Sequence, residues 1–223
     1  MTLATKDVSY WYGPEAPLFE HVNLTFEPGK IYAILGSSGS GKTTFLSLIA
    51  GLDTPKEGEI LYKDQSLKKI GLQQYRRKDV SIVFQAYNLL PYLSAVDNVV
   101  TAMKISGTQQ ADPKAYALGN LEKVGISREL AEKKVPLLSG GQQQRVAIVR
   151  ALCCDHDLIV ADEPTGNLDE TTSQDIVALF QEIAHEQQKC IILVTHEQEV
   201  AAACDVIYEL KDKEFQLREA SRN

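Results

Sequence analysis

The stretch Gly36-Ser37-Ser38-Gly39-Ser40-Gly41-Lys42-Thr43 decides the fold, because it fits the phosphate-loop pattern Gly-x4-Gly-Lys-[Ser/Thr]. Residues 31–35 before it are typical of a short buried strand, and residues 44–50 after it of an apolar helix. In this setting the glycines let backbone N–H groups turn toward phosphate oxygens, and the helix adds the positive end of its dipole. By chance the pattern alone occurs in about one chain in a hundred of this length, and far less often between a strand and a helix.

The loop predicts a nucleotide site in which each residue type has a separate task. Lys42 is expected on the β- and γ-phosphates, and the Thr43 hydroxyl on Mg²⁺, a hard ion that prefers oxygen ligands. We expect the nucleotide to contact Gly36, Ser37, Ser38, Gly39, Ser40, Gly41, Lys42, Thr43 and Thr44.

Two carboxylates follow a second strand-like segment. The apolar residues 158–161 are typical of a central strand, which delivers Asp162 and Glu163 to its C-terminal end. Asp162 is expected to hold Mg²⁺ or one of its waters, and Glu163 to orient and polarise the water that attacks the γ-phosphate. Two surface acids after a strand are the plain alternative, which the upstream phosphate loop disfavours.

The stretch Leu138-Ser139-Gly140-Gly141-Gln142 indicates a second anion site. A specified string of this kind occurs by chance in about a few chains in ten thousand. It precedes the helix-like residues 142–152, so that a hydroxyl and free N–H groups point outward from a helix N-terminus. One ATP cannot use both helix ends if they lie far apart on one chain.

With these motifs in place, the chain resembles the nucleotide-binding subunits of ATP-binding cassette (ABC) proteins over nearly its whole length. Gln85, after the strand-like residues 80–84, looks like the family's Q-loop glutamine and a further Mg²⁺ ligand. Residues 138–142 resemble the signature, and His196, after the strand-like residues 190–195, looks like the switch histidine. Asn167-Leu168-Asp169 resembles the D-loop, with Asp169 as its acid. Tyr12 stands where the family places a ring against adenine, although residues 10–12 also fit an amphipathic edge strand.

The resemblance implies an α/β phosphate-loop NTPase with the ABC ATPase fold. Its parts would be an N-terminal antiparallel β subdomain, a mostly parallel core sheet and an inserted helical subdomain. We expect one nucleotide-binding domain over residues 1–223, with the catalytic core at about 1–86 and 139–223 and the helical subdomain at about 87–138. Residues 22–26 and 58–62 are expected as antiparallel strands, and residues 206–210 and 214–217 as a closing hairpin.

The resemblance also implies how the protein works. Two copies would associate head to tail with ATP and Mg²⁺ between them, and the signature residues Ser139, Gly140, Gly141 and Gln142 of one copy would close over the ATP of the other. The expected catalytic residues are Glu163, His196 and Gln85. A separate membrane permease is the implied partner, docking near Gln85 and residues 86–92, where Leu89, Leu90 and Tyr92 could receive a coupling helix or simply pack within the subdomain.

The composition restricts the classes of partner and the cellular compartment that we expect for this chain. The net charge of −7 argues against a domain that grips nucleic acid, which usually needs a basic face. The short basic run Arg76-Arg77-Lys78 is either a solvated turn or a partner contact. The sequence shows no run of eighteen apolar residues and no signal segment, so we expect a cytoplasmic protein that is peripheral on the inner face of the cell membrane. The four cysteines are expected to be reduced packing residues.

Three functions compete at this point. An ATPase subunit of a transporter is favoured, a soluble ABC ATPase acting on ribosomes or chromosomes is second, and an unrelated phosphate-loop kinase or GTPase is last because it leaves residues 138–142 unexplained. Within the first, residues 138–147 and 161–169 resemble the MacB/LolD branch of macrolide and lipoprotein exporters, with Gram-positive peptide-export and peptide-resistance ATPases the most similar. The cell-division FtsE type is a near neighbour. Cargo and direction reside in the permease and leave no trace in these residues.

Overall fold

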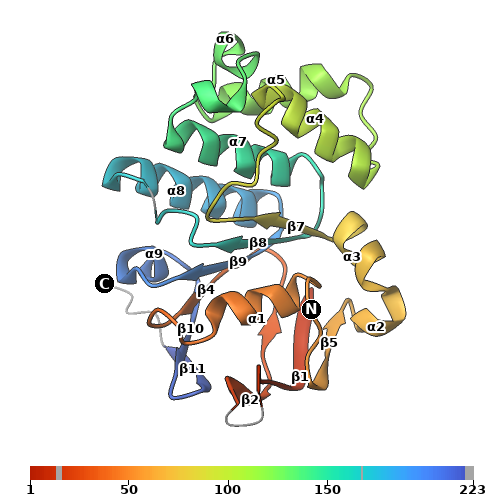
Figure 1. Ribbon diagram of the computed structural model, residues 1–223, viewed down its shortest axis with the longest axis vertical. Coiled ribbons are helices and arrows are strands. Elements are labelled where there is room, and N and C mark those ends of the chain that lie inside the picture. The colour runs from red at the N-terminus through yellow and green to blue at the C-terminus, as the bar shows by residue number, and fades with distance from the viewer. Residues whose placement is uncertain (14–16, 167, 219–223) are drawn as a thin grey trace.

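A mostly parallel sheet of six strands forms the centre of the computed structural model, which describes residues 1–13, 17–166 and 168–218 (Figure 1). The strand order is β11-β10-β4-β9-β8-β7, and each neighbouring pair is parallel except β10 and β11. The strands are β4 (Ile31–Leu35), β7 (Val80–Val83), β8 (Leu158–Asp162), β9 (Cys190–Thr195), β10 (Val206–Lys211) and β11 (Glu214–Arg218). The predicted core sheet and closing hairpin are therefore confirmed.

The second sheet is antiparallel and comes from the N-terminal part of the chain. It contains β1 (Leu3–Tyr10), β2 (Phe19–Val22), β3 (Thr25–Phe26), β5 (Glu57–Tyr62) and β6 (Gln65–Ser66). The continuous strand predicted at residues 22–26 is wrong, because β2 ends at Val22 and β3 begins at Thr25. The Leu24 N–H donates to the Thr5 hydroxyl at 2.8 Å instead of entering a regular ladder, which breaks the strand there.

Helix α1 (Lys42–Ile49) lies between the two sheets. One apolar cluster joins them through α1 and contains, among others, Phe19, Phe26, Ile34, Phe45, Leu48, Val160 and Ile192, each almost fully buried. Because α1 is packed on both sides, its N-terminus is held at one edge of the parallel sheet.

The opposite face of the parallel sheet is covered by α7 (Gly140–Leu152), α8 (Glu170–Glu186) and α9 (Gln198–Ala202) (Figure 1). Ile31, Ala33 and Leu35 of β4 point to this side, while Tyr32 and Ile34 point to α1. This alternation explains why β4 is apolar at every position, as a strand covered on both faces must be.

The helices of the upper part in Figure 1 pack on α7 and form a core of their own. They are α4 (Ala95–Ser106), α5 (Pro113–Lys123), α6 (Arg128–Ala131) and a short 3-10 turn, Val135–Leu137. The first three begin at Ser94, Asp112 and Ser127, whose side chains accept from the first-turn N–H groups. Helix α7 contributes Val146 and Val149 to this core and Ala147 and Ile148 to the sheet, so it belongs to both regions.

Two short helices, α2 (Leu67–Ile70) and α3 (Leu72–Lys78), connect the antiparallel sheet to β7. Among the residues the structure describes, no helix has the length and apolar character needed to cross a membrane.

Candidate functional site

The C-terminal ends of the parallel strands meet at one edge of the sheet, at the left in Figure 1. Leu35 of β4 pairs with Thr195 of β9, Asp162 of β8 with Val194, and Val83 of β7 with Ala161. Chain segments that are far apart in sequence therefore leave the sheet together. The phosphate loop, the two carboxylates, Gln85 and His196 all follow directly from these ends.

The phosphate loop runs from Gly36 to the start of α1 and needs its glycines. Gly39 and Gly41 have φ of 79° and 109°, which side chains rarely adopt, and a Cβ on Gly36 would lie 2.8 Å from the Leu210 carbonyl oxygen. Gly41 is the N-cap of α1 and provides no side-chain hydrogen bond. The first N–H groups of α1 are consequently left for another acceptor, at the positive end of the helix dipole.

Lys42 is curled over the loop and is only 5% exposed. Its Nζ donates to the carbonyl oxygens of Gly36 and Ser37, both at 2.8 Å. Burial lowers the pKa of Lys42, and the carboxylates of Glu163 and Asp162 oppose that shift. Next to it the Ser40 hydroxyl is buried without a hydrogen-bond partner among the described residues. A buried cation, an unpaired hydroxyl and open N–H groups fit an anion of several oxygens, such as a polyphosphate.

Thr43 and Asp162 form the second part of the site. The Thr43 hydroxyl donates to Asp162 Oδ1 at 3.2 Å, joining the first turn of α1 to the end of β8. Burial raises the pKa of Asp162, and the Thr43 hydrogen bond opposes the shift. These two side chains offer only oxygen, which suits a hard divalent cation such as Mg²⁺.

Glu163 has a positive φ and lies near Gln85 and His196, two other residues that the sequence predicts for the site. Its φ is +42°, and its N–H donates to the Val194 carbonyl at 2.9 Å. Glu163 Oε1 lies 3.1 Å from His196 Nδ1. A Cβ built on Gly166 would lie 3.4 Å from Glu163 Oε2 and 3.6 Å from Gln85 Nε2, so both polar groups border this glycine. The structure thus brings together Gln85, Glu163 and His196.

Gln144 is a residue that the sequence did not single out. It lies in α7, is 1% exposed and donates from Nε2 to the Pro164 carbonyl at 2.7 Å, immediately after Glu163. Its Oε1 has no hydrogen-bond partner among the described residues. Because Gln144 stands in the polar run Gln142-Gln143-Gln144-Arg145, the sequence offers no signal that its side chain is buried. The contact ties α7 to the backbone that carries Glu163.

Tyr12 lies beside the first turn of α1. Its hydroxyl is 2.7 Å from Thr44 Oγ1, and its ring meets that of Tyr10 edge to face, with centroids 5.2 Å apart. Tyr12 is 76% exposed, whereas Tyr10 is buried. One ring therefore packs inward while the other presents a free face next to the phosphate loop.

The segment Ser139–Gln142 forms a separate helix end. Ser139 is the N-cap of α7: its hydroxyl accepts from the Gln142 N–H, and the Gln142 side chain accepts from the Ser139 N–H at 2.9 Å. Within the described part of the chain, no hydrogen bond joins residues 139–142 to the phosphate loop. Ser139 and Gly140 are exposed, so this helix end faces outward.

Asp169 is the N-cap of α8. It accepts from the Thr172 N–H at 3.0 Å and from the Thr172 hydroxyl at 2.8 Å, and these hydrogen bonds lower its pKa. Asn167, the first residue of the expected D-loop, lies outside the described residues. After Gln85, Leu89 packs against both the sheet core and the helical core, while Leu90 and Tyr92 are exposed.

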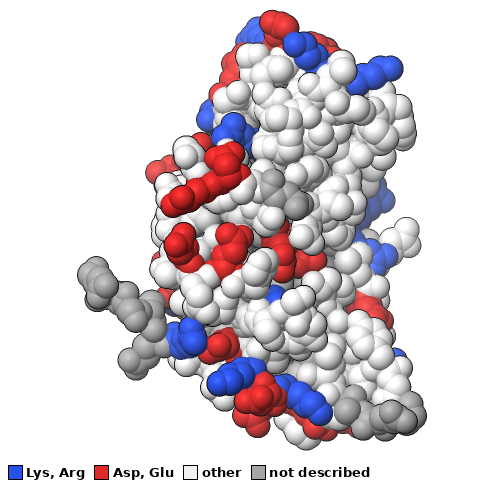
Figure 2. Space-filling view, turned by 60° about the vertical axis from the view of Figure 1, so that its left-hand side comes forward, with Lys and Arg blue, Asp and Glu red and all other residues white. Residues whose placement is uncertain are grey.

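Figure 2 shows the face on which the strand ends open. Asp and Glu gather across its middle, whereas most Lys and Arg lie toward its top and bottom. Asp162 is the last residue of β8, Glu163 and Glu197 come shortly after β8 and β9, and Glu170 begins α8. Carboxylates repel a bare anion. Their concentration beside one buried lysine therefore favours an anion that binds together with a divalent cation.

The chain is similar to known proteins over nearly its full length. Residues 19–166 match the family model described as ABC transporter. The "uncharacterized ABC transporter ATP-binding protein YclH" of Bacillus subtilis is 56% identical over 97% of this chain and 96% of its own. The lipoprotein-releasing system ATP-binding protein LolD of Chromohalobacter salexigens is 40% identical over 90% of this chain and 86% of its own.

A solved structure shows the same likeness in three dimensions. It is the dimeric post-hydrolysis state of the ATP-binding cassette MJ0796 bound to ADP and Pi, with a TM-score of 0.88 and 35% identity, and 98% of each chain is covered. The macrolide export ATP-binding/permease protein MacB of Hyphomonas neptunium is 40% identical over 93% of this chain but only 33% of its own length.

Proposed function

The chain belongs to the ABC transporter family as an ATPase of the MacB/LolD type, and we propose that it hydrolyses ATP in a head-to-tail dimer to power a separate membrane permease. The observation that carries the proposal is the placement of Glu163. Its carboxylate lies at the end of β8, beside Gln85 and within 3.1 Å of His196, at the strand edge where Lys42 and the open end of α1 also lie. An unrelated kinase or GTPase is excluded by the family.

Binding of ATP begins at the phosphate loop. The free N–H groups of α1 receive phosphate oxygens, and Lys42 exchanges its two carbonyl acceptors for the β- and γ-phosphates. The Tyr12 ring supplies a surface for adenine, since its exposed face lies next to Thr44. These contacts fix the γ-phosphate near the end of β8.

Thr43, Gln85 and Asp162 are the residues that would hold Mg²⁺, whose charge offsets that of the phosphate oxygens. The raised pKa of Asp162 in the free protein means that its carboxyl takes a proton at higher pH than usual. Thr43 already donates to one Asp162 oxygen, and Gln85, whose amide nitrogen lies near Gly166, would add its side-chain oxygen to the metal ligands.

Hydrolysis uses Glu163 as the residue that orients and activates water. The water oxygen bonds to the γ-phosphorus, the bond to the bridging oxygen of ADP breaks, and a water proton passes toward the Glu163 carboxylate. His196 Nδ1 lies 3.1 Å from Glu163 Oε1, and we propose that the imidazole also contacts the γ-phosphate. Gln144 and the Val194 carbonyl hold the backbone on each side of Glu163.

The second helix end explains the dimer. Ser139 to Gln142 form an exposed helix end that shares no hydrogen bond with the phosphate loop in the described residues, and we propose that this end binds the γ-phosphate of an ATP held by a second copy. The dimeric relative bound to ADP and Pi supports this arrangement. ATP then joins the two copies, and hydrolysis lets them separate. Motion is transmitted to the permease at the cytoplasmic face of the membrane.

The permease is proposed as a separate chain, as the relatives suggest. LolD is named as the ATP-binding protein of a lipoprotein-releasing system. MacB is named as an ATP-binding/permease protein, and the match covers only 33% of its length. The cargo is a peptide, lipoprotein or antibiotic.

We retain residues 87–138 as the helical subdomain, with α7 completing its core.

An affinity experiment tests this function. A tagged Glu163→Gln variant is incubated with Mg-ATP and detergent-solubilised membranes of the native host, and the captured proteins are identified by mass spectrometry. The matched control is Lys42→Ala/Glu163→Gln, which cannot retain ATP. A permease captured by the first variant and not by the second supports the proposal. Capture of partners of an FtsE-like cell-division system only, or of ribosomal or chromosomal proteins without a permease, would contradict it.

A further inference from the structure

A groove of about 620 Å³ lies between α8 and α9, the helices that begin shortly after Leu168 and His196 (Figure 1). Among the described residues, none of those that we assign to ATP, to Mg²⁺ or to the second copy lines it. The groove is thus distinct from the nucleotide site. Apolar residues form the groove floor, namely Leu168, Val177, Ala178, Val200 and Ala203.

Hydrogen bonds fix the helices that form the walls of the groove. Gln181 of α8 donates from Nε2 to the carbonyl of Ala203, the C-cap of α9, at 2.7 Å. The Thr165 hydroxyl, in the turn after β8, donates to Oε1 of Glu197, the N-cap of α9, at 2.7 Å. Val200 of the groove floor is buried in the core beside the parallel sheet. A groove that is already formed loses little conformational entropy when it is filled.

Three carboxylates line the groove without a cation of the same chain. These groove acids are Glu170 at the start of α8 and Glu197 and Glu199 at the start of α9. Within residues 1–13, 17–166 and 168–218, no lysine or arginine lines the groove or lies at ion-pair distance from a groove acid. Glu170 and Glu199 are exposed, so their carboxylates are open to a ligand.

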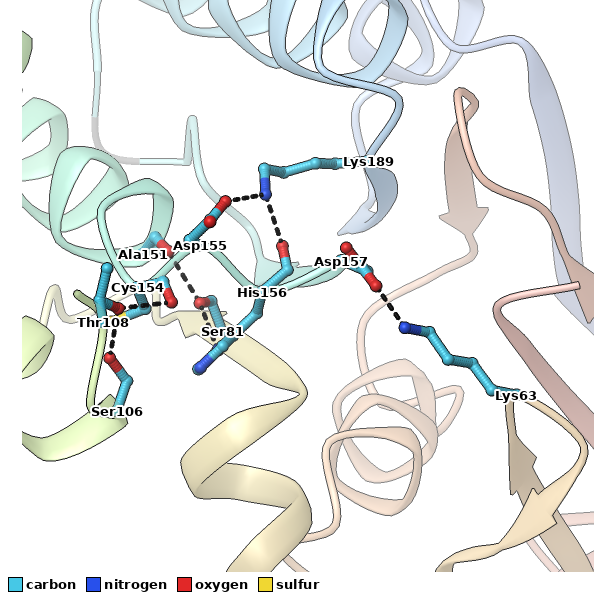
Figure 3. A network of polar contacts seen from close by, with 10 residues as sticks. All are labelled: Lys63, Ser81, Ser106, Thr108, Ala151, Cys154, Asp155, His156, Asp157 and Lys189. Carbon is cyan, nitrogen blue, oxygen red and sulfur yellow. Dashed lines mark hydrogen bonds and ion pairs between the residues drawn. The ribbon is translucent and has the colours of Figure 1, made fainter. Parts of the chain in front are cut away.

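Other acids of the chain are paired with lysines. Figure 3 shows Asp155 reaching Lys189 and Asp157 reaching Lys63, just before β8 and therefore at the opposite end of the strand that leads to Glu163. The groove acids have no such partner among the described residues. A cation from another molecule would therefore stabilise them.

The helix dipoles account for part of this arrangement. Glu170 and Glu199 are in the first turns of α8 and α9, where a carboxylate interacts favourably with the positive end of the helix. That interaction acts on each helix separately. Glu197 makes no side-chain cap to α9 and accepts from Thr165 instead, so stabilisation of the helices does not explain its position on the groove wall.

We propose that this groove binds a cytoplasmic segment of the membrane partner, with lysine or arginine side chains of that segment against the groove acids and an apolar side chain against the groove floor. The inference rests on the proposed function and adds a contact that is separate from the surface after Gln85. Cytoplasmic loops and tails of membrane proteins carry an excess of lysine and arginine, which complements the groove acids. The groove floor favours a peptide over a bare metal cation, because a cation would leave the apolar side chains uncovered.

The occupant of the groove would lie beside the segments that carry two expected catalytic residues. Glu197 directly follows His196, and Thr165, which donates to Glu197, comes two residues after Glu163. A cation at the second oxygen of Glu197 would therefore contact the same side chain that holds the turn after β8.

Charge changes in the purified complex test the proposal. The permease captured with Glu163→Gln is purified in detergent, and its affinity is measured for the wild-type ATPase and for three double variants: Glu170→Gln/Glu199→Gln, Glu170→Lys/Glu199→Lys and Glu182→Gln/Glu186→Gln. Glu182 and Glu186 are exposed acids of α8 outside the groove, so the third variant is a control with the same loss of charge. Thermal unfolding and basal ATPase activity of each variant alone verify folding.

The double lysine variant is expected to bind the permease at least about tenfold more weakly than the wild type. The groove glutamine variant should bind more weakly and with a smaller dependence on salt, and the control should match the wild type. If Glu170 and Glu199 serve only the helices, their replacement would lower the unfolding temperature and leave the affinity for the permease unchanged. Unchanged affinity of both groove variants would overturn this inference alone.

Photo-cross-linking in the same complex identifies the occupant. The photoreactive residue p-benzoylphenylalanine replaces Gln174, an exposed residue of the groove wall. We expect a cross-link to a cytoplasmic permease segment that contains lysine or arginine. A cross-link only to a second copy of the chain, or none to the permease, would overturn the inference. Failure of the wild type to bind any permease would overturn the proposed function, and this inference with it.

Discussion

The starts of α1 and α7 are both glycine- and serine-rich, yet they differ in how their N–H groups are satisfied. Gly41 leaves the end of α1 without a side-chain cap and beside the buried Lys42. Ser139 and Gln142 close the end of α7 with reciprocal hydrogen bonds, and that end is exposed. The N-terminus of α1 has no side-chain cap, and it carries Lys42, which the carboxylates of Glu163 and Asp162 in the same chain stabilise. The N-terminus of α7 is stable by itself and faces outward.

The difference indicates two modes of anion binding. A glycine N-cap such as Gly41 costs a helix only about a few tenths of a kcal/mol relative to a side-chain cap, which a phosphate bound at α1 would offset. The capping box of α7 keeps its first turn ordered when no ligand is bound. In our account α1 binds ATP within the chain, and α7 binds the ATP of a second copy.

The largest expected effect separates chemistry from binding at the α1 end. Glu163→Gln keeps the size of the side chain but removes the carboxylate, so hydrolysis should fall by about 10²–10⁴-fold while ATP affinity is retained. Steady-state phosphate release and equilibrium ATP binding measure the two. Undiminished turnover would refute the role of Glu163.

Removal of the buried cation should abolish tight binding at the α1 end. Lys42→Ala deletes both contacts to the loop and the charge expected on the phosphates, and we expect ATP affinity to fall by about 10²–10³-fold. Titration with a fluorescent ATP analogue measures it, with thermal unfolding as the folding control. Intact affinity would contradict the phosphate-loop assignment.

A change at the α7 end, unlike Lys42→Ala, should lower hydrolysis without weakening ATP binding to the single chain. Ser139→Ala removes the cap hydroxyl, so hydrolysis should fall by about 10²-fold, the scale of one preorganised donor, while binding of ATP to the single chain is unchanged. Loss of the cap lowers the free energy of unfolding by about 0.5–2 kcal/mol, which chemical denaturation measures. A matching fall in ATP affinity would place Ser139 in the site of its own chain instead.

The smallest expected effect concerns the contact between Tyr12 and the adenine ring of the nucleotide. Tyr12→Ala should weaken nucleotide binding by about 1–3 kcal/mol, whereas Tyr12→Phe, which loses only the hydroxyl contact to Thr44, should bind almost normally. Calorimetric titration of both variants with ATP makes the comparison. Equal, unchanged affinities would remove the ring from the site.

Local patterns predicted much of this molecule. The strand at residues 31–35 and the strand at residues 190–195 have the predicted bounds, because continuous apolar runs limited by turn residues are unambiguous. The motifs likewise placed Gln85, Glu163 and His196 after strand-like segments, and in the structure the three residues follow β7, β8 and β9. Their roles in catalysis stay predictions.

Features that depend on distant partners were not predictable. The strand at residues 22–26 is interrupted because Leu24 bonds to Thr5, nineteen positions away, which a period of two does not reveal. Gln144 gave no sign that it would reach Pro164. The ion pairs of Arg128, Arg145 and Arg218 with Glu122, Asp175 and Glu209 likewise arise only when the elements are assembled.

The central claim is that the end of α7 completes the ATP site of another copy. Light scattering during gel filtration of Glu163→Gln, with and without Mg-ATP, tests it most directly, with Ser139→Ala/Glu163→Gln beside it. The account predicts that ATP doubles the mass of the first variant and leaves the second a monomer with ATP bound. A monomer of Glu163→Gln saturated with ATP, or a dimer that forms equally well without Ser139, would contradict it.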